Sequence, residues 1–164
     1  MHRLHPSLLA LALLVPDLVP ALPGDREQPI RLQADQASFE QRTGVSIYEG
    51  NVEVSQGSMY LSADKATLFF DDVGQFQRME AVGSPSIFRY RPSANKPRID
   101  GTGRRIEYNA VSATVVVSGD ARFVQGGDRF SGERIEYDLE RDVVKAAGTQ
   151  DERIEFIIQP RSSQ

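Results

Sequence analysis

The sequence predicts an all-β protein, an elongated stack of short antiparallel strands, and three observations support this prediction. Apolar and polar residues alternate with a period of two, as at Val52 and Val54 on either side of Glu53, which is typical of strands with one buried face. Segments rich in Gly, Asn and Asp separate these runs and favour turns. A short pattern also recurs four times, and units this short must stack on one another to bury an apolar face.

Each copy of the pattern has a small residue, then apolar residues three and five positions later, and a glycine at its end. The small residues and the closing glycines are, in order, Ala34 and Gly50, Ala63 and Gly83, Gly103 and Gly119, and Gly132 and Gly148. The small residues predict bends, or places where another backbone comes close, because a larger side chain would block either. The second copy is longer than the others and is followed by Ser84-Pro85, which predicts a bulge or a weakened strand.

Turn chemistry divides the chain into successive hairpins. The turn segments are RTG at 42–44, QGS at 56–58, DDVG at 71–74, NKP at 95–97 and GGD at 126–128. Residues 91–97 give the longest loop signal, and we interpret them as an insertion between stacked units because the pattern resumes in phase at Gly101. A linker between two domains is the alternative. The last strand-like run alternates Ile154, Phe156 and Ile158 with polar neighbours.

Residues 1–21 have the features of an export signal peptide. Arg3 precedes an apolar run at 8–15, and small residues at 19–21 suit signal peptidase, so cleavage is expected after Ala21. The apolar run is too short to span a bilayer, which takes roughly 20 residues, and Pro16 and Asp17 interrupt it. A retained membrane anchor is the alternative. Residues 22–164 are then expected to form one domain.

The composition excludes several classes of chemistry. Cleavage would remove both histidines, His2 and His5, and the chain has no Cys and no Trp. Without His and Cys there is no histidine general base, no thiolate nucleophile, no Ser-His-Asp triad and no His or Cys zinc site. A net charge of −4 without a basic run argues against nucleic acid as a partner. We expect no cofactor.

Acidic residues recur in the pattern, but their placement favours structural roles. An acidic residue follows the small residue in three copies, at Asp35, Asp64 and Glu133, and Arg104 takes that place in the other copy. Paired carboxylates can hydrolyse glycosides, yet a repeated position that once inverts its charge indicates a turn or the surface. The pair at 71–72 lacks the ligand density of a calcium loop. We therefore expect no catalytic residue, no enzymatic activity and no metal site.

The candidate functional feature is the apolar face that the repeats share. Residues three and five positions after each small residue point the same way, and residues two and four positions after Gly50 and Gly119 join them. From this pattern the predicted lining includes Ala37, Phe39, Val52, Val54, Ile106, Tyr108, Phe123, Ile135 and Tyr137. Such a face forms either a closed core or a groove for acyl chains. In a groove, each methylene that is buried contributes about 0.8 kcal/mol to the free energy of binding. Periodicity leaves both alternatives open.

Several segments also occur in a specific order. They are QPI at 28–30 and ADQ at 34–36, EGNVEVSQG at 49–57, ADKA at 63–66, SGDA at 118–121 and GERIEY at 132–137. Each segment alone is a weak signal, but in this order, in a β protein without cysteine, they resemble the LptA (OstA-like) family of periplasmic lipopolysaccharide transport proteins. The likeness extends over about Asp25 to Pro160.

The resemblance implies an open antiparallel β-jellyroll, folded like a taco shell, that carries lipopolysaccharide across the periplasm and bridges the inner and outer membranes. It implies that the acyl chains of lipid A lie inside while the sugars face water. Positions that match groove-lining positions of the family are Ile30, Leu32, Phe88 and Tyr108. The implied partners are lipopolysaccharide, an LptC-like inner-membrane subunit, an LptD-like outer-membrane translocon, and further copies joined head to tail.

Two other functions stay open. One is an LptC-like subunit of the same route, held in the inner membrane by an uncleaved N-terminus. The other is a structural or carbohydrate-binding β-domain with a closed core; the absence of Trp weakens that reading, although five tyrosines are present and can stack on sugars. The two ends of the predicted sheet, at 30–34 and 153–158, are open edges that could pair with another molecule by strand addition.

Overall fold

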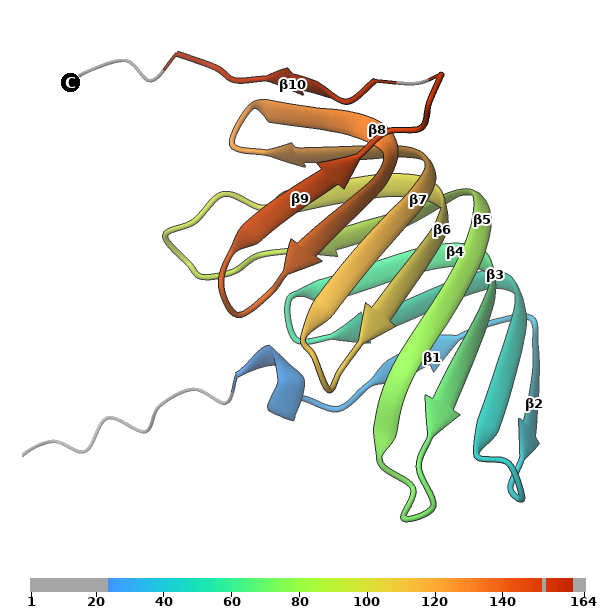
Figure 1. The fold of residues 1–164 in the computed structure, drawn as a ribbon. Coiled ribbons are helices and arrows are strands. Elements are labelled where there is room, and N and C mark those ends of the chain that lie inside the picture. Colours follow the sequence, from blue (N-terminus) through green and yellow to red (C-terminus); the bar gives the residue numbers. More distant parts are fainter. Residues whose placement is uncertain (1–23, 152, 161–164) are drawn as a thin grey trace, which may run out of the picture.

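The computed structural model describes residues 24–151 and 153–160, and a single curved sheet dominates them (Figure 1). The predicted signal peptide, residues 1–21, lies outside the described residues. Within these residues no helix combines the length and the apolar character needed to cross a membrane. The elements are η1 (Asp25–Glu27), β1 (Arg31–Gln33), β2 (Gln36–Glu40), β3 (Val45–Gln56), β4 (Met59–Phe70), β5 (Phe76–Tyr90), β6 (Ile99–Asn109), β7 (Thr114–Gln125), β8 (Asp128–Asp138), β9 (Val143–Ala147) and β10 (Glu155–Ile157).

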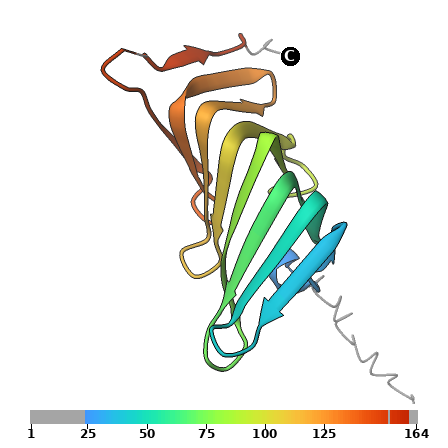
Figure 2. The same cartoon turned by 90° about the vertical axis from the view of Figure 1, so that its right-hand side faces the viewer.

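The sheet is antiparallel throughout and open. Its strands follow the order β1-β3-β4-β5-β6-β7-β8-β10, with β2 paired to β3 beside β1 and β9 paired to β8. Each edge therefore consists of two short strands, and the two edges lie at opposite ends of the molecule (Figures 1 and 2). The predicted all-β, open antiparallel architecture is confirmed.

A line of register shifts crosses the sheet. The shifts lie between Glu49 and Val52, Ser62 and Lys65, Val82 and Ser86, Thr102 and Arg105, and Ser118 and Ala121. Bulges bend strands, so the sheet folds along this line and its two halves face each other (Figure 1). We call them the β1 half, which also holds β10 and the connections at 57–58, 91–98 and 126–127, and the β2 half, which also holds β9 and the turns at 41–44, 71–75, 110–113 and 139–142.

The repeated small residues and glycines lie at this bend, as predicted. Gly50 and Gly119 have φ angles of 79° and 74°, a left-handed conformation that glycine adopts without steric cost. A Cβ atom on Gly103 would lie 2.9 Å from the carbonyl oxygen of Ser118, so the predicted close approach of another backbone is confirmed there. The predicted irregularity at Ser84-Pro85 is also confirmed, since these residues fall within the register shift between β5 and β6.

The four sequence repeats correspond to the four hairpins of the β2 half, namely β2–β3, β4–β5, β6–β7 and β8–β9. Between them lie the hairpins of the β1 half, and the loop signal at 91–97 falls between β5 and β6. Strands β3 to β8 are 11 to 15 residues long, longer than the short strands expected. The difference arises because two sequence runs, one on each side of the bend, join into one strand.

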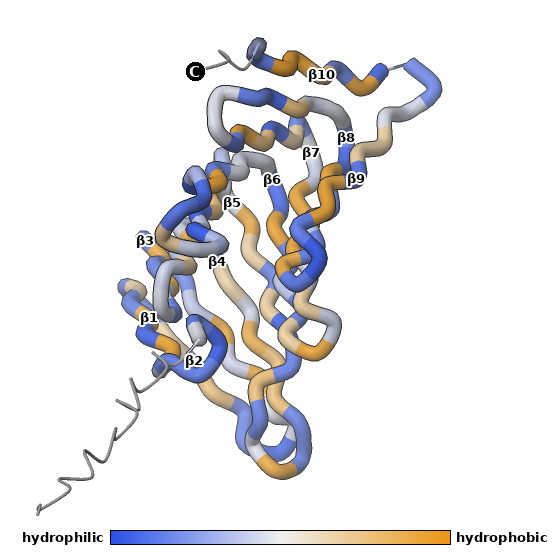
Figure 3. The backbone as a smooth tube through the Cα atoms, turned by 90° about the vertical axis from the view of Figure 1, so that its left-hand side faces the viewer, coloured by the Kyte–Doolittle hydropathy of each residue, from blue (hydrophilic) through white to orange (hydrophobic). Residues whose placement is uncertain are grey.

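Cross-strand partners form apolar rows that run from one edge of the sheet to the other. In the β1 half, one row comprises Leu32, Val54, Leu61, Phe88, Gly101, Phe123, Phe130 and Phe156. In the β2 half, a second row comprises Phe39, Ser46, Leu68, Met79, Tyr108, Val115, Tyr137 and Val144, and a third comprises Ala37, Tyr48, Ala66, Ala81, Ile106, Val117, Ile135 and Ala146. Most members belong to one buried cluster between the halves, and hydrophobic segments recur from strand to strand in Figure 3.

Candidate functional site

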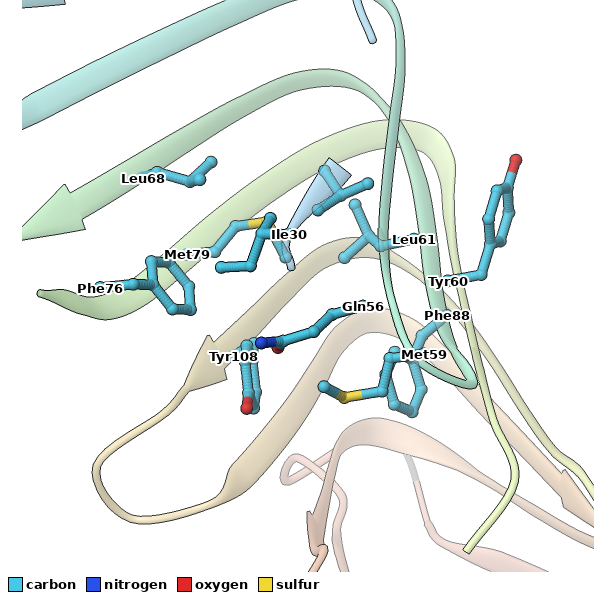
Figure 4. Close-up of a pocket in the computed structure, with 11 residues that line it drawn as sticks. Ile30, Gln56, Met59, Tyr60, Leu61, Leu68, Phe76, Met79, Phe88 and Tyr108 are labelled. Atoms are coloured by element: carbon cyan, nitrogen blue, oxygen red, sulfur yellow. The ribbon is translucent and has the colours of Figure 1, made fainter. Parts of the chain in front are cut away.

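An apolar cavity lies between the two halves, toward the N-terminal edge. Its lining residues are Ile30, Val54, Gln56, Met59, Tyr60, Leu61, Leu68, Phe76, Met79, Phe88 and Tyr108. Figure 4 shows side chains of the β2 half, among them Phe76 and Met79, converging with Met59 and Leu61 of the β1 half. The space left between the side chains is only about 30 Å³. An acyl chain can therefore enter only if side chains or the two halves move apart.

The structure brings most of the predicted lining residues into one interior. Ile30, Val54, Phe88 and Tyr108 line the cavity, and Leu32 is partly buried against the same core. Five others are at most 1% exposed in that core, namely Val52, Ile106, Phe123, Ile135 and Tyr137.

Ala37 and Phe39 differ from the other predicted lining residues. They lie on the interior face, as the register with β3 shows, but no other strand of the part that the structure describes covers the edge strand β2. Ala37 is therefore exposed, and Phe39 is 62% exposed. The two side chains mark the open end of the apolar rows.

Several lining residues were not predicted from the sequence. Met59 and Leu61 alternate around Tyr60, so the period-two signal that found Val52 and Val54 could have found them. Gln56 carries no such signal. Its amide Nε2 donates hydrogen bonds to the carbonyls of Arg26, at 3.1 Å, and Gln28, at 2.9 Å.

In the C-terminal part of the interior, aromatic rings from both halves pack against one another. The Phe123 ring centroid lies 5.4 Å from that of Tyr137 and 6.1 Å from that of Phe130, and the Tyr90 and Tyr137 centroids are 6.4 Å apart. The Tyr137 hydroxyl donates a hydrogen bond of 2.7 Å to Asp142. Burial raises the pKa of Tyr137, and this hydrogen bond raises it further.

Polar contacts join the free ends of the two halves at the mouth of the groove. The Lys96 ammonium, on the loop after β5, donates to Oδ2 of Asp142 at 2.5 Å. The Arg26 guanidinium, in η1, donates to Oε1 of Glu140 at 2.7 Å and to the carbonyl of Ala110 at 2.8 Å. The hydrogen bond from Lys96 lowers the pKa of Asp142 most, followed by the one from Tyr137.

The lowered pKa of Asp142 predicts an acid-sensitive contribution to stability. Ionised Asp142 stabilises the fold above the ordinary aspartate pKa of 3.8, and this contribution is lost as the pH falls through the lowered pKa of the folded protein. We expect Asp142→Asn to lower the free energy of unfolding at neutral pH, with the difference from wild type shrinking below about pH 4. Urea unfolding across this range measures it. A difference that stays constant down to the acid end would contradict the assignment.

The described residues contain no group of three or more His, Cys, Asp and Glu side chains placed to hold a metal ion.

With the open sheet and its apolar interior established, comparison with known proteins decides the family. The family described as LptA/(LptD N-terminal domain) LPS transport protein matches residues 31–143. The chain belongs to this family.

Individual members of the LptA family match this chain in sequence over most of its length. The chain is 38% identical to the lipopolysaccharide export system protein LptH of Pseudomonas aeruginosa, over 86% of this chain and 85% of that protein. It is 26% identical to the lipopolysaccharide export system protein LptA of Escherichia coli K12, over 99% of this chain and 89% of that protein. The resemblance seen in the sequence is therefore confirmed.

A solved structure agrees with the LptA-family fold. It is the crystal structure of LptH, described as the LptA homologous periplasmic component of the conserved lipopolysaccharide transport device from Pseudomonas aeruginosa. The TM-score is 0.79 at 36% identity, and the match covers 84% of this chain and 100% of that chain. The open antiparallel sheet is thus shared with a relative of known structure.

Proposed function

We propose that this LptA-family protein carries lipopolysaccharide across the periplasm, with the acyl chains of lipid A held between the two halves of the sheet. The observation that supports this most is the continuity of the apolar rows, which run from β1 and β2 to β9 and β10 without a charged member. Acyl chains need such a wall, because burial of their methylenes is the main favourable term. In this role the protein supplies a passage and performs no catalysis.

We further propose that copies of the chain join head to tail, and that the ends of the assembly meet an LptC-like subunit at the inner membrane and an LptD-like translocon at the outer membrane. Among the described residues, the edge strands β1, β2, β9 and β10 each pair on one side only, which favours strand addition. Each edge also carries an exposed aromatic side chain at the end of an apolar row, Phe39 on β2 and Phe156 on β10, the latter 47% exposed. Joining the edges would bury these rings and continue the rows.

The exposed ring on β10 allows a test of this assembly. We expect Phe156→Lys to weaken self-association, because a charge at the end of the row opposes burial at the joint. Sedimentation velocity over a range of concentrations measures the effect. Ile157→Lys is the matched control, since Ile157 is the next residue of β10, is 40% exposed and points to the opposite face. Equal weakening by both substitutions would contradict the proposed role of the interior face.

Photo-crosslinking in cells that make lipopolysaccharide tests the carrier function directly. A crosslinking amino acid at Phe88 or Tyr108 faces the cavity, whereas one at Glu107, adjacent on β6, or at Glu136 on β8 faces outward. We expect lipopolysaccharide adducts at the first two sites and none at the last two. A folded, exported protein that gives no adduct at either interior site has a closed core, the alternative that the small cavity favours, and the carrier function would be abandoned.

The mass of the protein made in the same cells distinguishes the carrier from an LptC-like anchored subunit. We propose that the exported form begins after Ala21, so its mass is that of residues 22–164. Mass spectrometry of the purified periplasmic protein measures this. A full-length mass in the membrane fraction would favour the anchored subunit instead.

A further inference from the structure

The turn between β8 and β9 carries two carboxylates that hold cations from the opposite half of the sheet. Glu140 accepts a hydrogen bond of 2.7 Å from Arg26, and Asp142 accepts one of 2.5 Å from Lys96. The turn belongs to the β2 half. Arg26 lies in the segment before β1 and Lys96 in the loop between β5 and β6, so both cations belong to the β1 half. The two ion pairs therefore join the halves across the mouth of the groove.

The segment at 24–30 is itself fixed to the β1 half. Gln56 donates to two of its carbonyls, and the Ser58 hydroxyl is hydrogen-bonded to the Asp25 carboxylate. From this anchorage Arg26 reaches Glu140 and also the carbonyl of Ala110 on the turn after β6, and Figure 1 shows η1 beside that turn. The segment thus spans the mouth as a strap, directly beside the cavity that its own Ile30 helps to line.

These ion pairs are accessible to a competing anion. The exposed fractions are 45% for the Arg26 side chain and 68% for Glu140, and 49% for Lys96 and 29% for Asp142. Exposed ion pairs contribute little to stability, whereas a phosphate accepts paired hydrogen bonds from a guanidinium. A lipid whose acyl chains enter the cavity at Tyr108 places its headgroup at the mouth, where Arg26 and Lys96 already lie.

We propose that Glu140 and Asp142 latch the groove shut in the lipid-free protein, and that a phosphate-bearing lipid headgroup opens it by taking Arg26 and Lys96 from these carboxylates. The inference rests on the proposed carrier function and adds to it the residues that bind the headgroup. A ligand shifts an equilibrium only through its different affinity for the two states. Here that difference arises because the two cations are free to bind the headgroup only when the latch is open.

The test compares uptake of bis-phosphorylated lipid A with uptake of the same lipid after dephosphorylation. Glu140→Gln/Asp142→Asn removes the latch anions, Arg26→Gln/Lys96→Gln removes the cations, and Glu107→Gln, whose partner Arg105 lies on the same strand, is the matched control. We expect the first variant to load both lipids faster than the control does. We expect wild type to bind the phosphorylated lipid about tenfold more tightly than the dephosphorylated one, and the cation variant to lose that preference.

A second measurement replaces the Arg26–Glu140 ion pair by a covalent link that can be cut. The chain has no cysteine, so Arg26→Cys/Glu140→Cys provides two unique sites for a bis-maleimide linker that a reductant can cleave. We expect the linked protein to take up lipid only after cleavage, while each single-cysteine variant loads throughout. Uptake by the linked protein at the unlinked rate, or an undiminished phosphate preference in the cation variant, overturns the latch. Absence of uptake by every form, wild type included, instead overturns the carrier function and the latch with it.

Discussion

Phe123→Ala is expected to lower the free energy of unfolding by about 3–5 kcal/mol. Phe123 is fully buried and packs against Phe130 in its own half and Tyr137 in the other. Truncation removes these contacts and leaves a cavity, and rings held from both halves have little freedom to collapse into it. Urea denaturation of the purified protein, monitored by circular dichroism, measures the loss.

Phe39→Ala is the matched control for this result. It removes the same ring from the same interior face, but at the uncovered edge, where Phe39 is 62% exposed. We expect a change within about 0.5 kcal/mol. If the two variants lost equal stability, the packing contrast between the C-terminal interior and the open edge would not hold.

Tyr108→Asp is expected to abolish lipid binding while costing less stability than Phe123→Ala. Tyr108 lines the apolar cavity and also a larger, partly polar pocket at the mouth, together with Arg26 and Gln56. An aspartate there can turn toward the mouth and stay hydrated, but its charge would lie where acyl chains must pass. Titration with a fluorescent acyl probe and urea denaturation measure the two effects separately.

Tyr108→Phe is the control for that substitution, because it keeps the ring and removes only the hydroxyl. Binding of the acyl probe should be retained. A Tyr108→Asp protein that loses cooperative unfolding together with binding would mark Tyr108 as an ordinary core residue, and the cavity would then have no role in lipid entry.

The fold was largely predictable because it is built from local signals repeated many times. The alternation at Val52 and Val54 predicts strands with one buried face, and both side chains are buried. The small residue at Gly103 predicts a close approach, and the neighbouring strand leaves no room for a Cβ atom there. Repetition also gave the hairpin order, since each copy of the pattern is one hairpin of the β2 half.

The features that escaped prediction depend on contacts between distant segments. The alternation at 154–158 predicts a strand where β10 lies, but β1 has three residues, too few for a periodic signal. Nothing in the sequence indicated that β1 and β2 would share one edge of the sheet and β9 and β10 the other. Arg26 and Glu140 are 114 positions apart, and neither has a sequence context that indicates its partner. The folding of the sheet alone brings them together at the mouth.

For a similar reason, the sequence predicted some of the residues that line the cavity and missed others. Ile30, Phe88 and Tyr108, assigned through the family resemblance, line the same cavity. Ala37 and Phe39 were assigned by periodicity, which identifies a face of a strand but contains no information about what covers that face. Phe76 lies where the register between β4 and β5 shifts, and a shift interrupts the periodic signal that would have revealed it.

The line of register shifts has a mechanical consequence. A hydrogen-bonded sheet resists shear and stretching, but a bulge leaves residues unpaired, and here the unpaired positions of five adjacent strand pairs fall on one line. We expect that line to act as a hinge. The angle between the halves can change there while the ladders within each half stay intact, so the width of the passage can adjust to chains of different bulk without breaking its walls.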